Sequence, residues 1–330
     1  MGAQRPDCRA VTTRWGIAGT GGIAARFVQA LHQTPDAELV AVGSRTDRRA
    51  DAFADEWDIP HRHGDYDDLA RDDDVDVVYV ATPQSRHADD ACRYLDAGKH
   101  VLCEKPMAMT EAEVLRMTAS AHMAERFLME AIWSRFLPAY ARLWELLLHG
   151  RIGEPLFVEA DFGFAMPVDP AHRLFDPARG GGALLDLGVY PLQLASLVLG
   201  QPDRVVASGH MGETDVDETV VAALHHPGGK LAVVKASIRV NLACTARIVG
   251  TEGSIELPAF MHCPESLTVR DAFGQAEVIE APIEGEGLRY QVDEVHRGLA
   301  EGVGESRVMT LHESAQIAAT MDTIRDQIDR

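Results

Sequence analysis

The sequence predicts an α/β protein: a doubly wound parallel sheet in the first part of the chain, followed by an α+β domain with a large open antiparallel sheet. Two observations lead to this fold class. Apolar strand patterns alternate with helix patterns from residue 14 to about residue 132, which is typical of a parallel sheet. From residue 133 onward, short segments with period-two alternation follow one another through Gly- and Pro-containing turns, which is typical of antiparallel strands.

Length, charge and cysteine content limit the classes of function. A chain of 330 residues can form two domains, and we expect a mobile tail over 1–13, a first domain over 14–132 and a second over 133–330. A net charge of −20 argues against nucleic acid and membrane surfaces as partners. Because the five cysteines include no C-x-x-C pair and the first residues lack an apolar run, we expect a cytoplasmic protein without disulfides.

The first element is a strand, a glycine turn and a helix start. The apolar run Trp15–Ala18 meets the turn Gly19-x-Gly21-x-x-Ala24, and an alanine-rich helix pattern follows at once. This order matches the dinucleotide-binding fingerprint of a Rossmann domain, in which backbone N–H groups and the helix N-terminus face the phosphates. A plain turn is the alternative. The cofactor-binding residues predicted in this turn are Gly19, Thr20, Gly21, Gly22 and Ile23.

The end of the second strand pattern bears on the choice of cofactor. An NAD-binding enzyme usually places an acidic residue there, whereas this chain has Ser44-Arg45, followed by Arg48 and Arg49. A hydroxyl and guanidinium groups suit a 2′-phosphate. We therefore predict NADP(H) as the preferred cofactor, with NAD(H) possible, and assign Ser44, Arg45 and Arg49 to it. A solvated helix face is the alternative for the arginines.

Two later strands end in residues that should lie beside the same cofactor, because open α/β sheets bind ligands beyond the carboxyl ends of their strands. Thr82 and Pro83 follow the strand pattern at 74–81. His87 opens the next helix, where it either contacts the cofactor or only caps and packs. The strand His100–Cys103 leads directly into Glu104-Lys105, and a Lys there points to where a nicotinamide would lie. We predict no metal site, and we interpret His61 and His63 as loop residues.

A buried helix in the second part carries the remaining candidates. It follows a run of three glycines, and Asp186 and Tyr190 share one of its faces because they are four residues apart. A carboxylate on so apolar a helix is costly unless something satisfies it, which favours a site over a purely structural role. The stretch Leu184–Gly200 is too short and too polar for a membrane span. Arg135 and His172 are weaker candidates for lining a substrate cleft.

With these residues in hand, the chain resembles the glucose-fructose oxidoreductase / inositol dehydrogenase (Gfo/Idh/MocA) family from about Arg14 to its last helix. The resemblance is carried by GIAGTGGIA, ATPQSRH, CEKPM and GGGALLDLGVYP, which occur in the family's order. The stretch MEAIWSRF and Tyr190 look most like the branch that holds dimeric dihydrodiol dehydrogenases and NADP-dependent D-xylose dehydrogenases. Many relatives, inositol dehydrogenases among them, carry His in place of this Tyr, which weakens an inositol assignment.

The resemblance implies an NAD(P)-dependent dehydrogenase or reductase that acts on CH–OH groups of a sugar, polyol or dihydrodiol. It implies Lys105 and Tyr190 as the catalytic pair, Asp186 as their helper, and a cis peptide bond at Lys105-Pro106. We expect Lys105 to lower the pKa of Tyr190, which then serves as acid and base, although Lys105 itself as the proton carrier stays open. The resemblance also implies a homodimer or homotetramer built on the second sheet.

A function of a different class is a dinucleotide-binding regulatory protein of the same fold without turnover. Such proteins tend to lose the Lys of the E-K-P motif or the acid/base residue. This chain has Lys105 and Tyr190, which favours an enzyme.

Overall fold

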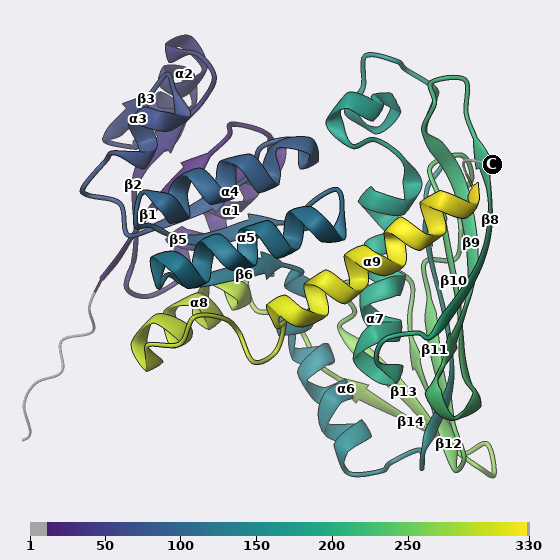
Figure 1. Cartoon of the computed structure of the whole chain (residues 1–330). Helices are drawn as coiled ribbons and strands as arrows, with labels where there is room; N and C mark the ends of the chain where they lie inside the picture. The colour runs from purple at the N-terminus through teal and green to yellow at the C-terminus, as the bar shows by residue number, and fades with distance from the viewer. Residues whose placement is uncertain (1–11, 329–330) are drawn as a thin grey trace, which may run out of the picture.

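The computed structural model describes residues 12–328, and these residues build two sheets side by side (Figure 1). Residues 1–11 of the expected tail lie outside the described range, and the first strand already begins at Thr13. The two predicted parts of the chain correspond to the two sheets, one parallel and one mostly antiparallel.

The first sheet is parallel throughout and has the strand order β3-β2-β1-β4-β5-β6, the doubly wound order of a Rossmann domain. Its strands are β1 (Thr13–Ala18), β2 (Ala37–Gly43), β3 (His61–His63), β4 (Val77–Val80), β5 (His100–Glu104) and β6 (Leu128–Ala131). Its helices are α1 (Gly22–His32), α2 (Asp47–Trp57), α3 (Tyr66–Ala70), α4 (His87–Asp96) and α5 (Glu111–Ala124), with the short turn η1 (Gln84–Arg86) before α4.

Local sequence explains these elements. Helix α5 begins with a variant of the capping box. The Thr110 hydroxyl accepts a hydrogen bond from the N–H of Glu113, and the Glu113 carboxylate accepts one from the N–H of Met109, the residue before the N-cap. The central strands are apolar on both faces, since helices cover both. Phe27 of α1 stacks on Tyr79 of β4 with 3.7 Å between ring centroids, which holds the first helix against the sheet below the glycine turn.

The second sheet has eight strands in the order β14-β13-β12-β11-β7-β10-β9-β8. The expected large antiparallel sheet is confirmed with one exception, because β7 and β10 run parallel. A tight turn determines only that the two strands it connects pair antiparallel. No tight turn connects β7 to its neighbours β11 and β10, so the sequence pattern does not specify this pairing. The strands are β7 (Pro155–Gly163), β8 (Arg204–Met211), β9 (Asp217–His226), β10 (Lys230–Ser237), β11 (Ala246–Gly250), β12 (Gly253–Leu257), β13 (Ser266–Asp271) and β14 (Ala276–Glu280).

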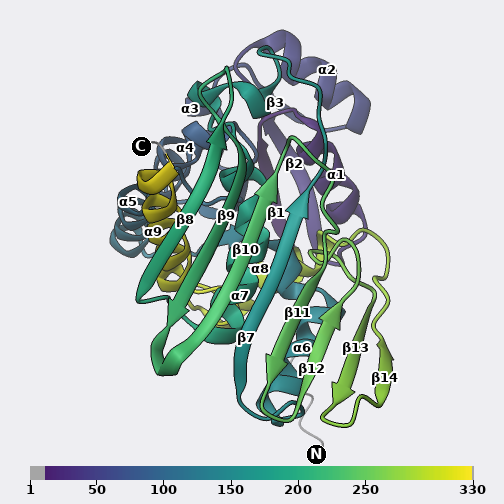
Figure 2. The ribbon, with the colours of Figure 1, turned by 90° about the vertical axis from the view of Figure 1, so that its right-hand side faces the viewer.

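Within residues 12–328, helices cover only the inner face of this sheet, the face toward the first domain (Figure 1). In Figure 2 the outer face lies open to the viewer, with no helix over it. The helices and helical turns of this part are η2 (Trp133–Phe136), α6 (Pro138–Leu148), η3 (Arg173–Phe175), η4 (Pro177–Arg179), the π-helical turn η5 (Leu184–Gly188), α7 (Val189–Leu199), η6 (Pro227–Gly229), α8 (Arg289–Glu301) and α9 (Leu311–Ile328).

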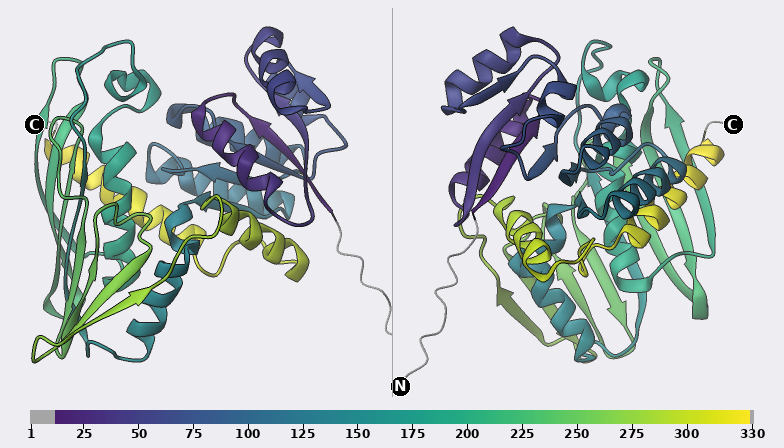
Figure 3. Two further views of the ribbon diagram at one scale, coloured as in Figure 1. Left: turned by 180° about the vertical axis from the view of Figure 1, so that it is seen from behind. Right: turned by 60° about the vertical axis from the view of Figure 1, so that its left-hand side comes forward.

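The last two helices return toward the first domain. Helix α8 packs beside α1 (Figure 3), where the indole N–H of Trp15 lies 3.1 Å from Nε2 of His296. Helix α9 packs on both α5 and β8 and so joins the two sheets. The strands of the first sheet thus end at Ala131 and those of the second begin at Pro155, while α8, from the end of the chain, lies against α1 of the first domain. The boundary between 132 and 133 stays a prediction.

One stretch of the described residues, Pro177–Leu199, is long and apolar enough to cross a membrane by length and composition alone. This differs from the expectation that the segment is too short and too polar. However, 78% of its most apolar window is buried inside the protein. Its continuous helical part, η5 and α7, packs on β7 and β10 in the core.

Candidate active site

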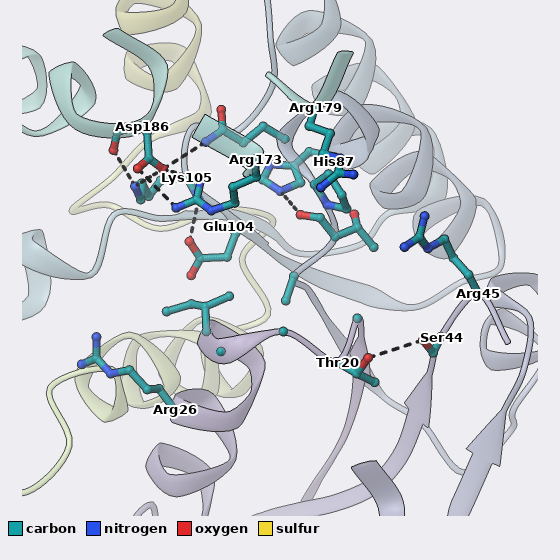
Figure 4. Close-up of a pocket in the computed structure, with 18 of the residues that line it drawn as sticks. Thr20, Arg26, Ser44, Arg45, His87, Glu104, Lys105, Arg173, Arg179 and Asp186 are labelled. Atoms are coloured by element: carbon teal, nitrogen blue, oxygen red, sulfur yellow. Dashed lines mark hydrogen bonds and ion pairs between the residues drawn. The ribbon is translucent and has the colours of Figure 1, made fainter. Parts of the chain in front are cut away.

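A cleft of about 600 Å³ lies where the carboxyl ends of β1, β2, β4 and β5 face helix α7 of the second domain (Figure 4). Every cofactor-binding and catalytic residue predicted from the sequence lines it. These residues are Gly19, Thr20, Gly21, Gly22, Ile23, Ser44, Arg45, Arg49, Thr82, Pro83, His87, Glu104, Lys105, Asp186 and Tyr190.

The glycine turn leaves room for a ligand's phosphates. Gly19 has a φ of +113°, and a Cβ there would come within 2.6 Å of the carbonyl oxygen of Ala81. A Cβ on Gly21 or Gly22 would meet no atom within 4 Å, so the glycines leave open space at the N-terminus of α1. No side chain caps that helix, and its first N–H groups are therefore free for an anion. These features fit a dinucleotide.

Ser44, Arg45 and Arg49 lie together at one end of the cleft, and we call this group the basic pole. Arg45 and Arg49 are exposed and line the cleft, and Ser44 is buried with its hydroxyl 3.5 Å from that of Thr20. Tyr66 joins them from the start of α3. The donors at this end are hydroxyl and guanidinium groups, which suit a phosphate ester better than a free ribose hydroxyl.

His87 packs in the wall of the cleft, and its contact with the cofactor stays a prediction. Its ring is buried, with Nδ1 and Nε2 each 2.9 Å from a carbonyl oxygen, that of Pro106 and that of Thr82. Burial lowers the pKa of the ring. His87 thus ties the loop after β4 to the cis Lys105-Pro106 peptide that follows β5. The Thr82 hydroxyl is buried in this wall without a partner among the described residues.

Lys105 reaches the second domain from the end of β5. Its ammonium donates to the main-chain carbonyl of Asp186 at 2.7 Å and lies 3.5 Å from Oδ1 of the same residue. Burial lowers the pKa of Lys105, but Asp186, Tyr190 and Glu104 outweigh it, so the pKa lies above its usual value. The amine is therefore a fixed cation at neutral pH.

The π-helical turn η5 explains how Asp186 presents both its main-chain carbonyl oxygen and its carboxylate to the ammonium of Lys105. Wider turns leave main-chain carbonyls without the usual helical partner, and such turns recur at functional sites. Asp186 sits inside η5 and is buried. Burial would raise the pKa of its carboxyl, but Lys105 and Arg173 lower it below the usual range, so the group is ionised.

Tyr190 lies over the same ammonium, with Nζ of Lys105 4.8 Å from the ring centroid. The indole N–H of Trp133 donates to the phenol oxygen at 3.2 Å. Burial raises the pKa of Tyr190, and the lowering by Lys105 does not overcome it. The expectation of a lowered pKa is therefore wrong for this structure, because the phenol is almost completely enclosed.

Besides Ala81 at the end of a predicted strand, sequence reasoning missed seven residues of the cleft wall. Gln84 follows the expected strand end at Thr82-Pro83 without a predicted role, and Tyr66 gave no signal. Trp133 and His262 come from segments that only the fold brings to Tyr190, where the His262 ring lies 4.9 Å from the phenol ring. The missed residues are Arg26, Tyr66, Gln84, Trp133, Arg173, Arg179 and His262.

Three secondary interpretations are corrected. Arg135 does not line this cleft, because its guanidinium is buried against Gln193 and Glu313 in the second domain. His172 caps its own turn by accepting from the N–H of Leu174. His61 and His63 form the edge strand β3 rather than a loop, and both imidazoles contact Oδ2 of Asp72, at 2.8 and 2.9 Å.

Comparison with known proteins identifies the family. Residues 13–131 match the profile described as "Oxidoreductase family, NAD-binding Rossmann fold", and residues 140–256 match the GFO/IDH/MocA C-terminal domain. The chain belongs to the GFO/IDH/MocA oxidoreductase family. The chain is therefore an NAD(P)-dependent dehydrogenase or reductase with an NAD-binding Rossmann domain.

Relatives in this family are similar over nearly the whole chain. The trans-1,2-dihydrobenzene-1,2-diol dehydrogenase of Danio rerio is 40% identical over 96% of this chain and 96% of its own length. The enzyme of that name from Xenopus laevis is 38% identical over 96% of this chain and 98% of its own. This confirms the branch expected from the motifs.

Solved structures of the family agree in fold. The aldose-aldose oxidoreductase of Caulobacter crescentus, solved with glycerol, has a TM-score of 0.87 at 26% identity and covers 96% of this chain and 98% of its own. A 3-ketoreductase from Actinomadura kijaniata, solved with NADP and TDP-benzene, has a TM-score of 0.85 at 28% identity with the same coverage.

Proposed function

We propose that the protein is an NADP(H)-dependent oxidoreductase that interconverts a secondary alcohol or hemiacetal carbon of a sugar, polyol or dihydrodiol with its carbonyl form. One observation carries the proposal. Lys105 and Tyr190, from two different domains, converge in the same cleft as the glycine turn. Asp186 accepts a hydrogen bond from the ammonium of Lys105 and so holds it beside the ring of Tyr190. When bound, the nicotinamide supplies or accepts the hydride.

The chain's own residues manage the oxygen and its proton. Lys105 is a fixed cation that donates a hydrogen bond to the substrate oxygen and polarises it. This stabilises the negative charge that develops on that oxygen. Tyr190 exchanges the hydroxyl proton: the phenol gives it in reduction and the phenolate takes it in oxidation. Trp133 donates to the phenol oxygen and so stabilises the phenolate. Lys105 is the weaker candidate for the proton carrier, because its pKa is raised.

Preference for NADP(H) over NAD(H) rests on the basic pole of the cleft. Ser44, Arg45 and Arg49 would hold the 2′-phosphate, and no acidic residue at the end of β2 would repel it. The Actinomadura ketoreductase supports this choice, since its structure was solved with NADP. The substrate class follows the dihydrodiol dehydrogenases and the aldose-aldose oxidoreductase that the chain resembles.

The decisive experiment is turnover. Purified protein is mixed with NADP⁺ or NAD⁺ and a panel of aldoses, polyols and dihydrodiols, and reduced nicotinamide is followed by absorbance. We expect oxidation of at least one vicinal diol or aldose, with the higher kcat/KM for NADP⁺. Tight binding of NADPH without turnover on any substrate would favour the regulatory alternative, against which the presence of both Lys105 and Tyr190 argues.

We also propose that the protein forms a homodimer or homotetramer through the outer face of the second sheet and acts in the cytoplasm. That face carries Val206 and Val221, which are half exposed, around the ion pairs of Lys235 with Glu159 and Asp161. A broad face of this kind is typical of a subunit interface. The described cysteines are all free thiols, which supports a reducing compartment.

A further inference from the structure

Arg173 is the most open cation at the catalytic end of the cleft. Its side chain is 54% exposed, whereas those of Lys105 and Asp186 are 14% and 7% exposed. It comes from the turn η3, in the segment that connects β7 with η5, and it lines the cleft beside Lys105 (Figure 4). Neither the catalytic pair nor the cofactor end accounts for this residue.

The turn that presents Arg173 is firmly held by the glycine run that precedes η5. The N–H of Gly182 donates to the carbonyl of Leu174 at 2.9 Å, and that of Gly181 donates to the carbonyl of Asp176 at 3.0 Å. A Cβ on Gly181 would lie 2.7 Å from the Leu174 oxygen and 2.9 Å from the Arg173 oxygen. The close approach therefore requires glycine, and it fixes the backbone from which Arg173 projects.

The guanidinium shares the carboxylate of Asp186 with the catalytic ammonium. Nη1 of Arg173 donates to Oδ1 at 2.9 Å and Nη2 to Oδ2 at 3.3 Å, while Nζ of Lys105 lies 3.5 Å from that same Oδ1. Two cationic donors from different domains are thus anchored on one oxygen. Because an Arg fork has five N–H groups and Asp186 takes two, the half-exposed guanidinium has donors left for a ligand in the cleft.

We infer that Arg173 binds a second oxygen of the substrate, on the carbon next to the one that reacts. Lys105 and Tyr190 would hold the reacting oxygen, and Arg173, which can only donate, would hold a neighbouring hydroxyl or carbonyl oxygen. The favoured substrate class is then a vicinal diol or an α-hydroxy carbonyl compound rather than an isolated secondary alcohol. This inference rests on the proposed function.

The test compares two alcohols that differ by that oxygen, trans-1,2-cyclohexanediol and cyclohexanol, with NADP⁺ as the oxidant. We expect the wild type to favour the diol in kcat/KM by about 10- to 100-fold, the usual value of a hydrogen bond to a charged group. Arg173→Met should lose most of that preference, because it should lower kcat/KM for the diol by a larger factor than kcat/KM for cyclohexanol. Arg173→Lys keeps a partner for Asp186 but lacks the fork, and should fall between the two.

Two further readouts separate binding from structural support. If Arg173 only kept Asp186 ionised, Arg173→Met would lower kcat/KM for both alcohols by the same factor and would shift the pH profile of each. The inference would then be wrong. It would also be wrong if the wild type showed no preference for the diol. Retained NADPH binding by Arg173→Met, measured by fluorescence, shows that the cofactor site is intact. No turnover of any substrate by the wild type would instead remove the proposed function, and this inference with it.

Discussion

Lys105 is held by two oxygens of a single residue, the carbonyl of Asp186 at 2.7 Å and its carboxylate at 3.5 Å. A lysine side chain with four rotatable bonds would otherwise sample many positions. The contact joins the end of β5 to η5 and therefore joins the two domains across the cleft. Asp186 is thus a positioning residue in the proposed mechanism.

The first prediction concerns this contact. Lys105→Met should lower kcat by about 100-fold or more, because the polarising cation is lost. Asp186→Asn should lower kcat less, since its main-chain carbonyl still receives the ammonium. Steady-state kinetics with NADP⁺ and the best substrate of the panel measure both. Lys230→Met is the matched control, because Lys230 pairs with Glu154 on the surface; near wild-type kcat for Lys105→Met would refute its role.

The second prediction concerns the pH dependence of Tyr190. Burial raises the pKa of the phenol, so oxidation, which needs the phenolate, should increase as the pH rises into the alkaline range. Trp133→Phe removes the N–H that stabilises the phenolate, which raises that pKa further and moves the rising limb of kcat to higher pH. Tyr190→Phe should lower kcat by about 100-fold on the alkaline side, where the wild type has the phenolate, and should abolish the rising limb. A limb that stays in place in Trp133→Phe would contradict the hydrogen bond's role.

Much of the site was predictable because its residues follow strand ends. A glycine turn after a strand, and Lys105 at the end of another, fall at one sheet edge in any doubly wound fold. Arg173 and Trp133 were not predictable in this way. Their positions depend on how the second domain packs over the first, and no local periodicity encodes that packing. The parallel pairing of β7 with β10 escaped prediction because no tight turn connects these two strands.

The third prediction tests the basic pole. Arg45→Ala should lower kcat/KM for NADP⁺ by about 10- to 100-fold through loss of charge-assisted hydrogen bonds to the 2′-phosphate, and leave NAD⁺ nearly unchanged. Arg48→Ala is the matched control, because Arg48 is an equally exposed neighbour that does not line the cleft. An equal loss with both cofactors would mean that Arg45 binds a part common to them.

The fourth prediction concerns the outer face of the second sheet. Val221→Glu in β9 places a third carboxylate opposite Lys235, which already pairs with Glu159 and Asp161 on this outer face. Burying that additional charge in a subunit interface is costly. We expect light scattering to report a monomer for this variant and an oligomer for the wild type. Met123→Glu is the matched control, because Met123 is 87% exposed on α5, away from this sheet. An oligomer unchanged in Val221→Glu would place the interface elsewhere.

The fifth prediction concerns Glu130 of β6, which is 2% exposed. Its carboxylate accepts a hydrogen bond at 2.8 Å from the N–H of Met107, a residue two positions after Lys105. Burial raises the pKa of its carboxyl to about 7. The folded protein then binds a proton that the unfolded chain has already lost, so this group's contribution to stability falls as the pH rises from about 4.5 to 7. Glu130→Gln keeps the acceptor and cannot ionise. Relative to the wild type, its free energy of unfolding should therefore gain up to about 3 kcal/mol between pH 5 and pH 8. Urea unfolding at the two pH values measures this, with the exposed Glu56→Gln as control; a difference independent of pH would show that Glu130 is ionised throughout.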